Sequence, residues 1–163
     1  MRLKVVYVEM QSLIDCEKLV EDSERAYIAP APGENLEIRL ISPEMPKERF
    51  LLNIREGRRS STLILKAVAG RKVTMQTRDS TVPLVRVDIG DELLHTNPDG
   101  SIVRGGHVHV ASWEYGMRTA YPLSSAEAIM VVGNKKSVED IFEAFRAFCH
   151  IERNLSLQWT FGI

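Results

Sequence analysis

Three histidines in one short stretch, His95, His107 and His109, could do chemistry together. His107 and His109 are one residue apart, so in a strand both would point to the same face, about 7 Å apart along the backbone. His95 precedes them across the turn 97–100. Three neutral imidazoles can bind Zn, Mn or Fe and activate water, with Asp99 or Glu114 as a carboxylate ligand or general base. The pattern predicts a divalent metal site, and a catalytic site made of these histidines and Asp99.

Two other interpretations use the same residues. Two of the histidines could act as general acid and base on a phosphodiester without metal, because a pKa near 6.5 suits both roles. Alternatively, His107 and His109 hydrogen-bond to the preceding loop and hold the turn 97–100, while Arg86 and Asp88 form a cross-strand ion pair. A basic surface on the same face as the histidines would favour nucleic-acid chemistry.

The basic residues are concentrated in one part of the chain. The whole sequence carries a net charge of −1, but residues 55–78 carry +6. Such a stretch predicts a partner that is either an acidic protein surface or a nucleic acid. Alternatively, it is a solvated hairpin whose charges protect exposed strand edges. Trp113 and Tyr115 are of the types that anchor interfaces, although Trp113 fits core packing equally well. The basic candidates are Arg55, Arg58, Arg59, Lys66, Arg71, Lys72 and Arg78.

The elements that would position these residues follow from apolar spacing. Residues 1–30 predict a strand at 2–9 and a helix from Ser12 to about Arg25, with Ser12 and Asp15 at capping-box spacing. The β-rich core is expected at 36–123. Alternation predicts strands through Leu36, Ile38 and Leu40; Phe50, Leu52 and Ile54; Leu63, Leu65 and Ala67; Val73, Met75 and Thr77; and from Pro83 to Ile89.

The C-terminal part predicts one more helix and one more strand. Phe142, Phe145 and Phe148 fall on one helical face over 137–152, behind a Ser137 cap. Alternation over 155–161 predicts a final strand. The whole chain, 1–163, is therefore expected to be a single α+β domain. Its mostly antiparallel sheet would form a meander or a partial barrel, with an N-terminal helix and a Phe-rich C-terminal helix.

Composition and motifs exclude several classes. No apolar run reaches the roughly 20 residues of a membrane-spanning helix. Walker A, dinucleotide-binding, Cys-x-x-Cys and Gly-x-Ser-x-Gly motifs are absent. No secretion signal is recognised, so Cys16 and Cys149, both in predicted helices, are expected to be reduced thiols in a cytoplasmic protein. No membrane partner and no cofactor other than a divalent metal is expected.

Five blocks of sequence resemble a family of uncharacterised bacterial proteins of phages and integrative elements. They cover roughly the C-terminal half, and the resemblance implies a mobile-element setting but no activity. The blocks are LVRVDIG, HTNPDG with HVHV, EYG, AYPL and FRAFCHI, within residues 84–151.

Two functions follow as hypotheses. The first is an accessory or regulatory binding protein of a mobile element, which engages an acidic protein surface or nucleic acid through the basic hairpins. The alternative is a small hydrolase, a nuclease or phosphodiesterase, centred on His95, His107 and His109.

Overall fold

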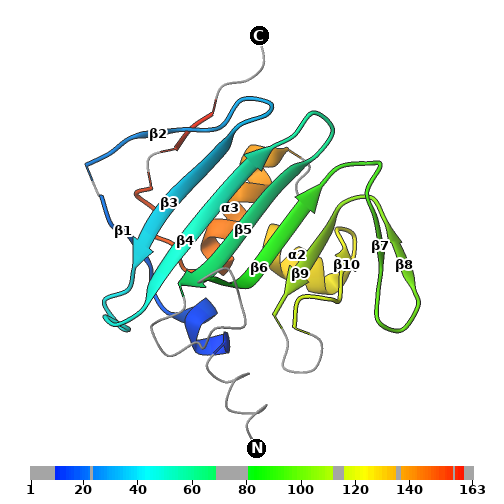
Figure 1. Cartoon of the computed structure of the whole chain (residues 1–163), viewed down its shortest axis with the longest axis horizontal. Coiled ribbons are helices and arrows are strands. Elements are labelled where there is room, and N and C mark those ends of the chain that lie inside the picture. The colour runs from blue at the N-terminus through cyan, green and yellow to red at the C-terminus, as the bar shows by residue number, and fades with distance from the viewer. Residues whose placement is uncertain are drawn as a thin grey trace, which may run out of the picture.

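A computed structural model describes residues 10–22, 24–68, 81–111, 116–134, 137–155 and 157–159. Within them, a seven-stranded sheet has the order β1-β3-β4-β5-β6-β9-β10, and all neighbouring strands are antiparallel (Figure 1). The strands are β1 (Leu19–Val20), β3 (Asn35–Ile41), β4 (Arg49–Glu56), β5 (Ser61–Val68), β6 (Thr81–Ile89), β9 (His107–Val110) and β10 (Tyr121–Pro122).

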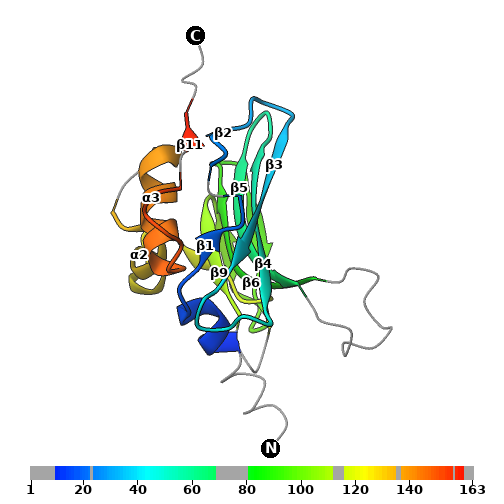
Figure 2. The same ribbon diagram turned by 90° about the vertical axis from the view of Figure 1, so that its left-hand side faces the viewer.

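A short N-terminal helix over residues 10–15, two further helices and two small sheets complete the described fold. Helices α2 (Ala126–Val132) and α3 (Val138–Phe148) cover one face of the large sheet, and no described helix covers the other (Figure 2). A parallel pair joins β2 (Tyr27–Ile28) to β11 (Leu157–Gln158). An antiparallel hairpin joins β7 (Leu94–Thr96) to β8 (Ile102–Arg104). No helix in the described residues is long and apolar enough to cross a membrane.

The core lies between the sheet and the helices. Phe50, Leu52 and Leu63 alternate with more exposed residues along β4 and β5 and are fully buried. Phe142 and Phe145 of α3 belong to the same buried cluster. The predicted α+β class, the strands now called β3, β4, β5, β6 and β9, and the Ser137-capped helix are therefore confirmed.

Lys18 ties the N-terminal segment to the helix layer. Its ammonium group is completely buried and donates to the carbonyls of Ile14, Cys16 and Cys149, each at 2.8 Å. Burial lowers the pKa of this lysine. The three carbonyls match the three donors of an ammonium group, which compensates for part of the cost of burying the charge.

Several predictions at the ends of the chain were wrong. The N-terminal helix does not reach Arg25: residues 10–15 are helical, and Leu19–Val20 is instead β1, paired with Leu40 and Ile41 at the sheet edge. Cys16 therefore follows this helix and Cys149 caps α3; both are free and buried. The strand at 2–9, the strand through 73–77 and the end of the one at 155–161 lie outside the described residues.

Two features of the architecture also differ from expectation. The sheet is open rather than a partial barrel, because its edge strands β1 and β10 do not pair with each other. Helix α2 was not predicted, although Ser125 caps it by accepting a hydrogen bond from the amide of Ala128. Its seven residues are too few for a clear helical periodicity. The strand expected at 155–161 is reduced, within the described residues, to Leu157–Gln158.

Candidate metal centre

His107 and His109 lie on the face of the sheet opposite the helices. In the register of β6 and β9, His107 is opposite Asp88 and His109 is opposite Arg86. Val108 between them points into the core and is fully buried. The alternation predicted for this strand is confirmed. Both histidines are nevertheless 5–6% exposed, because other segments cover them on this side.

The hairpin of β7 and β8 supplies His95 and much of that cover. In Figure 1 the hairpin lies beyond the β9 and β10 end of the sheet. The side chain of Asn97 fixes it to the neighbouring segment, because it donates to the carbonyl of Ala120 at 3.0 Å and accepts from its amide at 2.7 Å. His95 Nε2 lies 2.6 Å from the carbonyl oxygen of Arg118. The loop from 91 to 106 therefore folds back onto β9.

The three imidazoles meet in one cavity. The ring centroids are 5.6 Å apart for His95 and His107, 4.9 Å for His95 and His109, and 5.0 Å for His107 and His109. One nitrogen from each ring lies within 4.8 Å of the other two. The cavity has a volume of about 420 Å³ and opens to solvent; the other residues that line it are Ile64, Pro83, Arg86, Asp88, Leu93, Leu94, Met117 and Arg118.

Hydrogen bonds to backbone carbonyls fix the protonation of two of the six ring nitrogens. A carbonyl oxygen only accepts, so Nε2 of His95 and Nδ1 of His107, which lies 2.9 Å from the carbonyl of Gly105, must carry protons. Nε2 of His107 lies 3.4 Å from Oδ2 of Asp88, and Nε2 of His109 lies 3.9 Å from it. Nδ1 of His109 is buried and, among the described residues, has no hydrogen-bond partner.

Asp88 is the carboxylate of this site. Arg86 binds it through two nitrogens at 2.9 and 3.0 Å, and Thr62 donates to it at 3.0 Å. Burial alone would raise the pKa of Asp88, but hydrogen bonds from His107, Arg86 and Thr62 hold that pKa well below its usual range. Asp88 therefore stays ionised. The predicted pair of Arg86 and Asp88 exists, but along β6 and not across strands.

The electrostatic environments of the two buried histidines differ. The hydrogen bond to Asp88 raises the pKa of His107, against the opposing effect of burial. Burial lowers the pKa of His109 to about 4, and the neighbouring His107 and His95 add to that shift. In the metal-free protein the ring of His109 is therefore neutral at neutral pH.

Asp99, the carboxylate chosen from the sequence, lies elsewhere. It is exposed and accepts hydrogen bonds from the amide of Ser101 at 2.9 Å and from its hydroxyl at 2.6 Å. These bonds lower the pKa of Asp99 and give it a role in the turn, and it does not line the cavity. Sequence reasoning missed Asp88 as a site residue. Pairing the strand at 84–89 with that at 107–110 would have placed it beside His107.

The basic candidates divide into three groups. Arg55 and Lys66 lie on the same face of the sheet as the histidines, as the register shows below. Arg58 and Arg59 are exposed in the turn between β4 and β5, where Arg59 forms a salt bridge with Glu92 at 2.9 Å. The others, Arg71, Lys72 and Arg78, and the aromatic candidates Trp113 and Tyr115, lie outside the described residues, as does Glu114.

An open antiparallel sheet with helices on one face and a three-histidine cluster on the other defines an α+β protein with a candidate metal centre. The chain belongs to a family of unknown function, DUF6978, which it matches over residues 8–152. That match extends well beyond the C-terminal half on which the resemblance rested. It brings neither an activity nor an origin, so the setting in phages or integrative elements stays a prediction. A comparison with curated proteins found no match, and neither did a comparison with solved structures.

Proposed function

We propose that His95, His107 and His109 bind one divalent metal ion and that the protein is a metal-dependent hydrolase. The observation that carries this proposal is the convergence of three imidazole nitrogens within 4.8 Å in a cavity open to solvent. Three neutral imidazoles with space for a further ligand are the donor set of catalytic zinc sites, so zinc is the metal we expect.

The hydrogen bonds leave suitable nitrogens for a metal. His95 donates its Nε2–H to a backbone carbonyl, which leaves the lone pair of Nδ1 for coordination. His107 donates its Nδ1–H to a carbonyl, so it would coordinate through Nε2, and the metal would replace the proton that Nε2 now shares with Asp88. Metal-ligating histidines usually donate their second ring nitrogen in this way. In His109, Nδ1 has no partner, and a metal ligand there would satisfy a buried polar atom that is otherwise left alone.

Asp88 would act as a positioning residue and not as a ligand. Its carboxylate is already held by Arg86 and Thr62. With His109 coordinated through Nδ1, its Nε2–H would point to Asp88, at a present distance of 3.9 Å. Such a carboxylate fixes the tautomer and orientation of the ring.

A bound zinc ion would lower the pKa of a coordinated water to near 7. Hydrolysis of a phosphodiester then adds water across one P–O bond. The water oxygen forms a new bond to phosphorus, the bond to one ester oxygen breaks, and that oxygen takes up the proton which the water gave up. Arg86, with its side chain 47% exposed at the cavity, would favour the anionic substrate.

Elemental analysis and titration with zinc test the metal centre, and bis(4-nitrophenyl) phosphate tests the activity. We expect one zinc per chain and metal-dependent hydrolysis, both lost in His107→Ala and His109→Ala. The matched control is His150→Asn, which alters the fourth histidine; His150 is exposed and has a φ of 56°, a conformation that asparagine tolerates. Normal zinc content in both alanine variants would contradict the proposal.

A second candidate uses the histidines as a metal-free acid–base pair. It is favoured by the opposite pKa shifts of His107 and His109, since a raised and a lowered pKa suit a general acid and a general base. The two functions differ in their response to a chelator. Hydrolysis that survives removal of all divalent metal would favour the acid–base pair over the metal centre.

A further inference from the structure

The face of the sheet that carries the histidine cluster has no described helix over it (Figure 2). Its side chains can be assigned from the register, because residues directly opposite on neighbouring strands share a face. One row across the sheet runs from Arg55 through Thr62 and Asp88 to His107. The adjacent row contains Asn53, Ile64, Arg86 and His109. The row after it contains Arg39, Leu51, Lys66 and Pro83.

This face of the sheet is positively charged although the chain as a whole is not. On β3 to β6 and β9 it carries five basic and two acidic side chains, a net charge of +3, against −1 for the entire sequence. The basic ones are Arg39, Arg49, Arg55, Lys66 and Arg86, and the acidic ones are Glu37 and Asp88.

Three of the cations are available to a ligand. Arg86 is engaged with Asp88, and Arg49 donates to the carbonyls of Pro46 and Glu48. Within the described parts of the chain, no salt bridge involves Arg39, Arg55 or Lys66. These side chains come from three adjacent strands, and none of them is paired with a carboxylate of the residues that the structure describes. Their charge therefore faces solvent.

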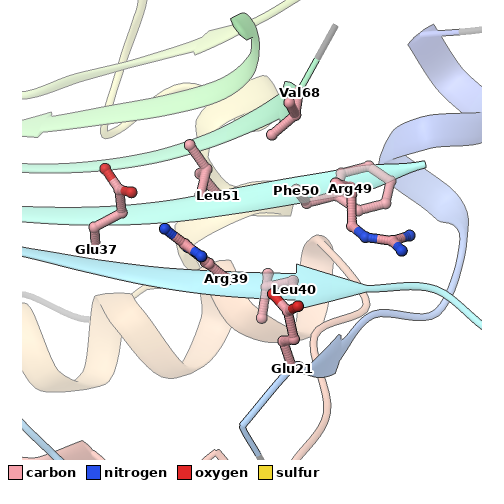
Figure 3. A pocket seen from close by; sticks show the side chains of 8 residues that line it. All are labelled: Glu21, Glu37, Arg39, Leu40, Arg49, Phe50, Leu51 and Val68. Carbon is pink, nitrogen blue, oxygen red and sulfur yellow. The ribbon is translucent and has the colours of Figure 1, made fainter. Parts of the chain in front are cut away.

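The charged face is continuous with the candidate metal centre. Lys66 is the register partner of Pro83, which lines the histidine cavity. Arg55 is three strands from His107, about 14 Å at the usual strand spacing. Further along the same face, Arg39 and Arg49 line a second hollow of about 330 Å³, with Leu51 and Val68 beside them (Figure 3). Glu21 and Glu37 also line this hollow, so two carboxylates accompany its two cations.

We propose that this face binds single-stranded nucleic acid, whose phosphodiester backbone crosses β4 and β5 and enters the histidine cavity. This inference rests on the proposed hydrolase and names its substrate. Cations spaced over adjacent strands suit a chain of repeating phosphates. A single strand can follow a flat sheet and reach into a narrow cavity between sheet and hairpin, whereas a duplex presents its groove edges to a protruding element.

Among the described residues of β3 to β6 and β9, no Phe, Tyr or Trp lies on this face, and Phe50 of β4 is buried in the core on the other. Base stacking on the sheet, which many single-strand binders use, is therefore not part of the interaction there. Recognition would depend on phosphate contacts and be largely independent of sequence. It should also depend strongly on salt.

Fluorescence anisotropy with labelled 12-nucleotide oligo-dT and oligo-rU, in the presence of chelator, measures binding without cleavage. The Arg55→Gln/Lys66→Gln double variant should bind about tenfold more weakly, and the slope of log affinity against log salt should fall by about 0.7 per lost phosphate contact. The control, Lys47→Gln/Arg153→Gln, removes two exposed cations that belong to no strand and should bind like the wild type. The two oligonucleotides distinguish DNA from RNA.

Zinc titration of the same variants separates this inference from the proposed function. The Arg55→Gln/Lys66→Gln variant should retain zinc. A His95→Ala/His107→Ala/His109→Ala variant should lose zinc, and its affinity for the oligonucleotide should fall less than that of the Arg55→Gln/Lys66→Gln variant. Equal affinity of both cation variants, equal or tighter binding of a 12-base-pair duplex, or stronger binding of poly-glutamate would each overturn the inference. None of these results would bear on the metal centre.

Discussion

Oδ2 of Asp88 in β6 lies 3.4 Å from Nε2 of His107, its register partner in β9. The same carboxylate is held by Arg86 and Thr62, so one strand fixes the orientation of histidines on the next. Replacement of Asp88 by asparagine keeps the size of the side chain but removes the charge. We expect zinc affinity to fall about 10- to 100-fold, as it does when partners behind metal-bound histidines are lost.

Isothermal titration with zinc measures this effect. The control is Glu92→Gln, which removes an exposed carboxylate that pairs with Arg59 outside the cavity. Unchanged affinity in Asp88→Asn would show that the carboxylate does not support the site.

The two histidines of β9 should titrate far apart in the metal-free protein. Proton NMR of the imidazole C–H groups should give His109 a pKa of about 4 and His107 a pKa above its ordinary value. His109 binds fewer protons folded than unfolded, so its contribution to stability is lost as the pH falls from about 6.5 toward 4. His107 has the opposite sign: its contribution is present below 6.5 and is lost as the pH rises through its raised pKa.

Chemical denaturation of the metal-free protein at several pH values checks the same point. His109→Asn should weaken the loss of stability between pH 6.5 and 4, whereas His150→Asn should leave the pH profile unchanged. Two indistinguishable histidine pKa values would contradict the electrostatic picture of the site.

Asn97 determines whether His95 reaches the other two histidines. Its side chain forms both hydrogen bonds that join the hairpin to Ala120. Asn97→Ala should leave those backbone groups without these partners, speed amide hydrogen exchange over residues 93–104 and weaken zinc binding severalfold. Asn154→Ala, at an exposed position after α3, serves as the control. Wild-type exchange and affinity in Asn97→Ala would rule out this anchoring role.

Lys18 should contribute to stability without taking part in function. Lys18→Met removes the donor for three buried carbonyls, so the free energy of unfolding should fall by about 3 kcal/mol or more. Urea denaturation measures the change. Lys47→Met, at an exposed position, should change stability by less than about 0.5 kcal/mol. A similar small effect for Lys18→Met would mean that the carbonyls find other partners.

The parts of the fold that the sequence predicted correctly are those with strong periodicity. The alternation in β3 to β6 and the Phe stripe of α3 each bury one face, which a linear pattern records directly. Leu19 and Val20 were assigned to a helix because two adjacent apolar residues fit either structure. Leu19 and Val20 form a strand because they pair with Leu40 and Ile41, which are distant in the sequence. The open sheet likewise depends on which edges meet, and no local pattern shows that.

The candidate metal centre was also predicted only in part, from the local pattern of its residues. His107 and His109 share a face because of strand alternation, which is local. Asp88 joins them only through the register of β6 with β9, and a turn residue, Asp99, was therefore chosen in its place. His95 reaches the cluster through a hairpin whose anchor is 23 residues away in the sequence.

X-ray absorption spectroscopy of the zinc-loaded protein tests the central claim most directly. We predict one zinc per chain, with three imidazole nitrogens at about 2.0–2.1 Å and one further light ligand. The number of imidazole ligands should fall in His95→Ala, His107→Ala and His109→Ala, and stay unchanged in His150→Asn. A protein that retains no zinc after dialysis, or whose zinc ligands are the same in all four variants, would contradict a metal centre at these histidines.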